Sequence, residues 1–106
     1  MNHKSERAAG QILVVDDDPL EVETLTLALE SLNCKVLPAY GGEQGFELAN
    51  QSLPQLIILD LLMPGVSGFD LVQRLRSNPR TIDIPVLIFT AKDITEEDRR
   101  QLNHHV

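Results

Sequence analysis

The sequence predicts an α/β fold in which a parallel sheet carries helices on both of its faces. Short apolar runs alternate with helical patterns four times along the chain. The runs show little polar alternation, which is typical of parallel strands buried on both faces. The connections are only a few residues long, and right-handed strand–helix–strand crossovers then place the strands side by side in one sheet.

The composition favours one soluble domain. The chain has 106 residues, 42% of them hydrophobic and 24% charged, which is enough for one modest core. Its formal net charge of -7 argues against nucleic acid as a direct partner, because phosphate backbones need a basic surface. No apolar run approaches the roughly 20 residues of a membrane span, and the single cysteine, Cys34, permits no internal disulfide. We expect a cytoplasmic domain over residues 11–106, after a flexible N-terminal tail over residues 1–10.

The first predicted strand runs from Ile12 to Val15 and ends in three acids, Asp16, Asp17 and Asp18. A helical pattern follows from Leu20 to Asn33, with one apolar stripe that includes Leu32. Asp18 is placed to cap this helix, with Pro19 at the first helical position and Glu21 three residues after the cap. Capping therefore explains the third acid and leaves the first two unexplained.

The later segments continue the alternation. A strand over 35–39 contains Pro38, which cannot donate to a sheet ladder and so favours an edge position. A short helix over 43–50 buries Phe46 and Ala49, although Gly45 weakens it. The apolar run over 56–59 is the third predicted strand. A helix follows it, marked by Phe69, Val72 and Leu75, and ends near residue 77. The last two predicted elements are a strand over 84–89 and a charged helix over 96–103.

Three of the four predicted strands end in polar groups, and in a parallel sheet these groups meet at one edge, where open α/β folds bind ligands. Asp16 and Asp17 follow the first strand, Asp60 follows the third, and Thr90 follows the fourth. Clustered carboxylates repel one another unless a cation neutralises them, and an oxygen-only set suits Mg²⁺. One carboxylate could then act as a nucleophile toward phosphorus, and the threonine hydroxyl could bond the phosphoryl oxygens.

Three segments, in this order and at this spacing, give the chain a family resemblance: ILVVDDDP at 12–19, LDLLMPGVSG at 59–68 and PVLIFTA at 85–91. From Gln11 to Val106 the sequence resembles the receiver domain of two-component response regulators. The resemblance implies a flavodoxin-like, three-layer α/β/α fold with the strand order 2-1-3-4, which a fifth strand continues in the family.

The resemblance also implies a role for each matching residue. Asp60 would be the phosphoacceptor, and the donor would be a histidine kinase or a histidine phosphotransfer domain. Mg²⁺ would be held by Asp16, Asp17, Asp60 and the backbone carbonyl of Leu62. Thr90 would be the switch hydroxyl, and Ala91 the small residue that admits the phosphoryl group. Such a domain is a conformational switch rather than an enzyme.

One departure from the family pattern concerns the C-terminus. Receiver domains carry a lysine at the end of a fifth strand, followed by a fifth helix, whereas this sequence stops at Val106, so we expect the fifth unit and its lysine to be absent. Lys92 lies two residues beyond Thr90 and is more typical of an exposed lysine. We then expect an exposed apolar edge over 86–89, with self-association through that strand or through the 96–103 helix. Phosphorylation would be slower without the lysine.

Two other functions stay open. A pseudo-receiver that acts only as an interaction module is favoured by the missing lysine and opposed by the intact acids. An aspartate-nucleophile phosphatase of the haloacid dehalogenase type is suggested by Asp16 and Asp18 in an Asp-x-Asp pattern, but Leu20 stands where that family has Thr or Val. The residue that becomes phosphorylated distinguishes the phosphatase from the receiver, because it would be Asp16 in the phosphatase and Asp60 in the receiver.

Overall fold

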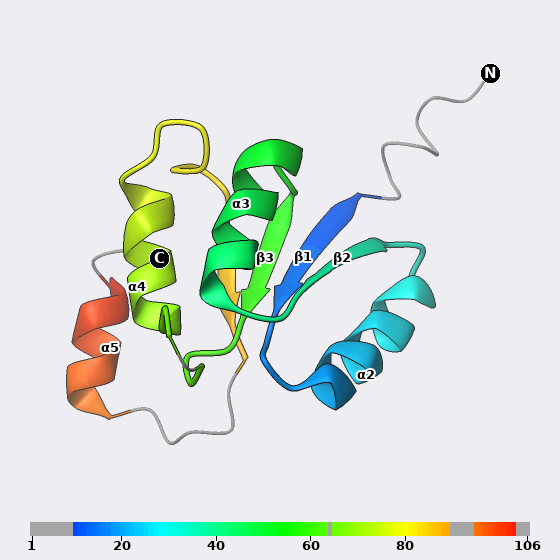
Figure 1. Ribbon diagram of the computed structural model, residues 1–106, viewed down its shortest axis with the longest axis horizontal. Coiled ribbons are helices and arrows are strands. Elements are labelled where there is room, and N and C mark those ends of the chain that lie inside the picture. Colours follow the sequence, from blue (N-terminus) through cyan, green and yellow to red (C-terminus); the bar gives the residue numbers. More distant parts are fainter. Residues whose placement is uncertain (1–9, 64, 90–94, 104–106) are drawn as a thin grey trace.

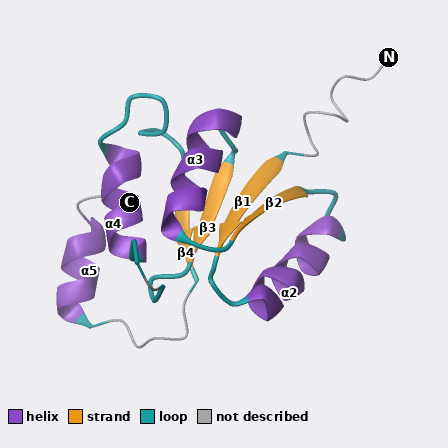
Figure 2. Ribbon diagram, in the orientation of Figure 1, coloured by secondary structure: helices purple, strands orange, loops and turns teal. Residues whose placement is uncertain are grey.

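The computed structural model describes residues 10–63, 65–89 and 95–103. Strands and helices alternate through this part of the chain (Figures 1 and 2). In order, they are β1 (Gln11–Val15), α2 (Pro19–Glu30), β2 (Lys35–Ala39), α3 (Gly42–Ser52), β3 (Leu56–Leu59), α4 (Gly68–Arg76), β4 (Val86–Ile88) and α5 (Glu96–Asn103). Among the described helices, none is long and apolar enough to cross a membrane.

The four strands form one parallel sheet in the order β2-β1-β3-β4, which confirms the predicted fold class and strand order. β2 pairs only with β1 within this sheet, so Pro38 lies on an edge strand as its missing N–H requires. β4 forms the opposite edge of the described sheet. There the side chains of Leu87 and Phe89 are 53% and 45% exposed, which agrees with the expected apolar edge.

Alternate residues of β1 supply the two halves of the core. Leu13 and Val15 pack in a cluster with residues of α3 and α4, whereas Ile12 and Val14 pack with Val22 of α2. This separation follows from the strand period of two, which sends successive side chains to opposite faces of a sheet. The result is the predicted three-layer arrangement, with α2 on one face, α3 and α4 on the other, and α5 beside α4 (Figure 1).

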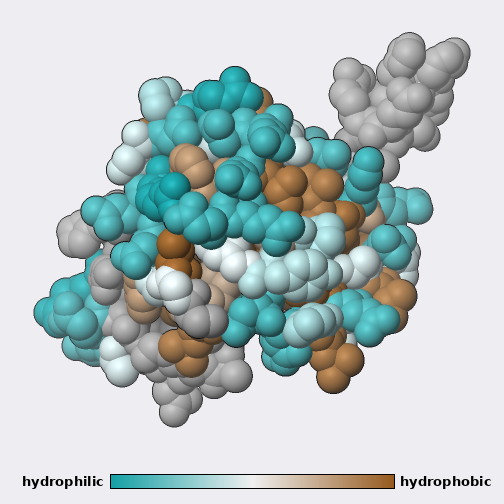
Figure 3. All heavy atoms as spheres, viewed as in Figure 1, coloured by the Kyte–Doolittle hydropathy of each residue, from teal (hydrophilic) through white to brown (hydrophobic). Residues whose placement is uncertain are grey.

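The surface carries hydrophobic residues among a hydrophilic majority on the face shown in Figure 3, some of them over α2. In α2, Leu20 and Leu27 are 68% and 64% exposed. Only Val22 of this helix is fully buried, with Leu25 and Leu29 packed at the edge of the core. The apolar stripe expected from the sequence is therefore only partly used for packing.

The structure corrects two predicted boundaries. α2 ends at Glu30 rather than Asn33, because Asn33 adopts a left-handed conformation (φ 66°) that reverses the chain toward β2 and leaves Leu32 exposed. β4 spans Val86–Ile88 rather than 84–89. The N–H of Ile84 donates to the carbonyl of Thr81 in the preceding turn, so Ile84 packs in the core without joining the sheet ladder.

Two glycines allow close approach between elements around the carboxyl edge of the sheet. A Cβ on Gly45 would lie 3.1 Å from Val15 Cγ1, so this glycine, which weakens the helix by propensity, lets α3 lie against β1. A Cβ on Gly68 would lie 2.6 Å from the carbonyl oxygen of Asp60 and from Leu61 Cα. The first residue of α4 thus packs directly on the backbone that follows β3.

Replacing Gly68 with alanine should destabilise the fold, because the added methyl group meets backbone atoms that cannot move aside independently. We expect a loss of about 1–3 kcal/mol in the free energy of unfolding, measured by urea denaturation. The matched control is Gly41→Ala, where a Cβ meets nothing within 4 Å and φ is -173°. The control should lose at most about 1 kcal/mol, for a weaker helix cap. Equal losses in the two variants would contradict the close-approach explanation.

Candidate functional site

The candidate site is built at the carboxyl ends of the two central strands. β1 and β3 pair in parallel with Val15 opposite Leu59, so the next residue of each strand, Asp16 and Asp60, leaves the sheet at the same level. Backbone hydrogen bonds extend one residue beyond the strands. Asp60 N–H donates to the Val15 carbonyl at 3.0 Å, and Asp16 N–H donates to the Ala39 carbonyl at 3.0 Å. The backbone of both aspartates is therefore fixed by the sheet.

The side chains of Asp16, Asp17 and Asp60 come together at this edge. One carboxylate oxygen from each lies within 4.8 Å of the others. Asp16 is only 2% exposed, Asp60 is half-buried and Asp17 is exposed, so the cluster runs from the sheet interior to the surface. The structure thus joins the three acids that the sequence singled out, while the role of each stays a prediction.

Asp16 is the buried member of the cluster, and one of its oxygens lacks a partner. Oδ1 accepts a hydrogen bond from the Asp18 N–H at 3.0 Å. Oδ2 is buried and has no hydrogen-bond partner within the described part of the chain. The pKa of this carboxyl is raised from 3.8 to about 7, mainly by burial, although the Asp18 amide acts in the opposite direction. The nearby Glu21 carboxyl and the charge on Asp60 contribute to the same rise.

Asp60 is oriented by the loop that follows it. Its Oδ1 accepts a hydrogen bond from the Leu62 N–H at 3.1 Å, two residues along the chain. Leu61 is buried in that loop, and its carbonyl accepts a hydrogen bond from the Gly68 N–H at 3.2 Å. The loop is therefore anchored both to the core and to α4. The Leu62 carbonyl as a metal ligand stays a prediction.

The donor set fits a magnesium ion. It consists of carboxylate oxygens, which Mg²⁺ prefers, and one of the three acids is buried with an unpartnered oxygen. A bound cation would supply the missing partner of that oxygen and offset the repulsion among the acids.

The other residues named from the sequence have separate outcomes. Asp18 caps α2, since its Oδ1 accepts a hydrogen bond from the Leu20 N–H at 3.0 Å, as predicted. Thr90, Ala91 and Lys92 lie outside the described residues. The sequence pattern assigns Glu21 only to the helix cap, yet its carboxyl contributes to the raised pKa of Asp16. The spacing of Glu21 from the cap carries no sign of that interaction.

Fold and site together define an α/β domain with an acidic, metal-suited site at the carboxyl edge of its sheet. A model of the response regulator receiver domain family matches residues 12–105. Protein PilH of Pseudomonas aeruginosa is 42% identical over 84 residues, which are 79% of this chain and 69% of PilH. The DNA-binding dual master transcriptional regulator RpaA of Synechocystis is 47% identical over 81 residues, which are 76% of this chain and 34% of RpaA.

A solved structure agrees with these matches. The N-terminal domain of a response regulator receiver protein from Methanoculleus marisnigri JR1 has a TM-score of 0.86 and 35% identity, covering 92% of this chain and 79% of that one. The chain therefore belongs to the response regulator receiver domain family. The chain spans only about a third of the length of RpaA, and the DNA binding in that name is a property of RpaA.

Family membership settles the broad class of function. Receiver domains are phosphoryl-accepting switches of two-component systems, they typically bind Mg²⁺ at an acidic pocket, and they interact with histidine kinases or phosphotransfer proteins. The phosphatase alternative loses its support, and Asp18, the second acid of its Asp-x-Asp pattern, is used as a helix cap.

Without metal, the protein should lose stability as the pH rises from about 4 to about 7. In this window folded Asp16 keeps a proton that unfolded Asp16, with its ordinary pKa of 3.8, has released. Stability falls with rising pH wherever the folded state binds more protons. The loss attributable to Asp16 is at most about 4 kcal/mol, at about 1.36 kcal/mol per pKa unit. Urea unfolding in EDTA, at about pH 5 and about pH 8, measures it.

The variant Asp16→Asn cannot titrate at this position, so it should be more stable than the metal-free wild type at about pH 8. At about pH 5, where wild-type Asp16 keeps its proton, this advantage of the variant should shrink or reverse. Saturating Mg²⁺ should remove the wild-type penalty at the higher pH, because a cation replaces the proton. A difference that is independent of pH would contradict the assignment of this effect to Asp16.

Proposed function

We propose that Asp60 is the phosphoacceptor of this receiver domain, with Mg²⁺ held by the carboxylates of Asp16, Asp17 and Asp60 and by the Leu62 carbonyl. The observation that carries the proposal is the meeting of three acids within 4.8 Å at one sheet edge, with a buried, unpartnered oxygen on Asp16. A set of acids crowded in this way is costly unless it serves to bind a cation.

The geometry of Asp60 supports its choice as the nucleophile. The Leu62 amide holds Oδ1, which leaves the second oxygen for bond formation to phosphorus. As that bond forms, the bond between phosphorus and the imidazole nitrogen of the donor breaks, and the nitrogen keeps the electron pair. When bound, Mg²⁺ would offset negative charge on the phosphoryl oxygens. Asp16 is buried and engaged with the Asp18 amide, which suits metal binding better than attack.

The remaining roles rest on the sequence resemblance. Thr90 would be the switch hydroxyl and Ala91 the small residue that admits the phosphoryl group, and both follow Phe89 at the end of the β4 segment. The donor would be a histidine kinase or a histidine phosphotransfer domain. Self-association through the exposed β4 edge is a further proposal, supported by the exposure of Leu87 and Phe89. A concentration-dependent sedimentation coefficient would test it.

Acetyl phosphate should add one phosphoryl group to this chain in the presence of Mg²⁺ and none in EDTA, as measured by intact mass. Asp60→Asn should abolish the gain, because the amide cannot attack phosphorus. The matched control is Asp70→Asn, an exposed acid in the first turn of α4, and it should be modified like the wild type.

Other results would point elsewhere. Modification that persists in Asp60→Asn but disappears in Asp16→Asn would reject Asp60 and return the phosphatase hypothesis. The absence of both Mg²⁺ binding and a mass gain would favour the pseudo-receiver, which acts as an interaction module without phosphorylation. Mg²⁺ binding without a mass gain would indicate a receiver site that holds the ion but is disabled as a switch.

A further inference from the structure

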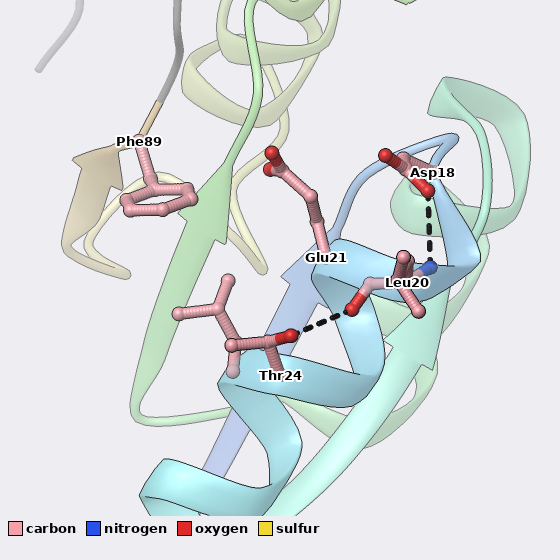
Figure 4. Close-up of a pocket in the computed structure, with 6 residues that line it drawn as sticks. Asp18, Leu20, Glu21, Thr24 and Phe89 are labelled. Atoms are coloured by element: carbon pink, nitrogen blue, oxygen red, sulfur yellow. Dashed lines mark hydrogen bonds between the residues drawn. The ribbon is translucent and has the colours of Figure 1, made fainter.

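A cavity of about 340 Å³ lies between the first turns of α2 and the end of β4, and Asp18, the residue after the paired acids Asp16 and Asp17, is part of its lining. Its lining is apolar on one side and acidic on the other: Leu20, Leu25 and Phe89, with Thr24, Asp18 and Glu21. In Figure 4 the Glu21 side chain extends from the first turn of α2 into the space between Phe89 and Asp18. No basic side chain is among these lining residues.

Glu21 does not perform the capping role that its position suggests. It is the third residue of α2, where a capping-box glutamate accepts the N–H of the cap residue. Here the Asp18 N–H donates instead to Asp16 Oδ1 at 3.0 Å. Among the described residues, Glu21 takes part in no ion pair and accepts no backbone hydrogen bond. Its carboxylate is therefore left for another partner.

The Glu21 carboxyl lies close enough to Asp16 for its negative charge to help raise the pKa of the Asp16 carboxyl. Asp16 Oδ2, at the same time, is buried without any partner in the part of the chain that the structure describes. Two facing carboxylates repel each other when both are ionised, so a cation between or beside them would relieve both features.

We propose that Glu21 is a fourth carboxylate of the magnesium site, one that accepts hydrogen bonds from the hydration shell of the ion and raises its affinity. Mg²⁺ keeps several of its waters in protein sites, so an acid just outside the direct ligands has donors to accept. Such outer partners commonly matter about tenfold or more for metal affinity. The inference rests on the proposed magnesium site and assigns to it a residue outside the three clustered acids.

Isothermal titration of the metal-free protein with MgCl₂ tests this role through the dissociation constant, without any phosphorylation. Glu21→Gln keeps the size and a hydrogen-bonding head group but removes the charge, and it should weaken Mg²⁺ binding about tenfold. The matched control is Glu23→Gln, an exposed acid two residues along the same helix that lines a different groove. It removes the same charge and should change the dissociation constant about twofold or less, because exposed charges are screened by salt.

Thermal unfolding in EDTA separates binding from folding. Relief of repulsion should leave the metal-free Glu21→Gln protein at least as stable as the wild type, while the Mg²⁺-induced rise in Tm becomes smaller. An unchanged dissociation constant in Glu21→Gln, or equal weakening in both variants, would overturn the inference. Loss of metal-free stability with unaltered Mg²⁺ affinity would also overturn it, since Glu21 would then be a structural residue.

Mg²⁺ binding by the wild type distinguishes failure of the proposed function from failure of the role assigned to Glu21. If the wild type binds no Mg²⁺, the proposed function fails together with this inference. If the wild type binds Mg²⁺ and Asp16→Asn abolishes binding while Glu21→Gln does not weaken it, only the role of Glu21 fails.

Discussion

The parallel pairing of β1 with β3 is the constraint on which the rest of this molecule depends. Its register sets Val15 opposite Leu59, and so it brings Asp16 and Asp60 out of the sheet side by side. The two aspartates do not attract each other, because two ionised carboxylates repel. Burial of the strands in apolar clusters on both faces supplies the stabilisation that holds these charges together.

At this site, strand pairing and apolar burial hold negative charges close together although they repel one another. One acid is buried with an oxygen that has no partner, and a second acid on α2 adds to the charge around it. With a formal net charge of -7, the chain as a whole also carries more negative than positive groups. The geometry therefore favours a bound cation at this edge, and binding of such an ion would be coupled to stability.

The surroundings of the site are held by close backbone packing together with backbone hydrogen bonds. Gly68 lets α4 begin against the carbonyl of Asp60, and the Leu61 carbonyl accepts the Gly68 amide. The buried side chain of Leu61 fixes the same loop from the other side. The Leu62 amide, which donates to one carboxylate oxygen, also orients the Asp60 side chain.

The sequence by itself determined the fold class, the edge position of the strand with Pro38 and the three acids at the sheet edge, because each depends on local patterns. Apolar runs, helix caps and residues that follow strands can be recognised within a few positions along the chain. Only the tertiary structure decided that Asp16 is buried with a free oxygen, that Glu21 faces it rather than the cap, and where α2 ends. The burial of Asp16 and the position of Glu21 depend on how separate elements pack, and the end of α2 depends on the backbone conformation of Asn33. Neither can be recognised from the order of residues along the chain.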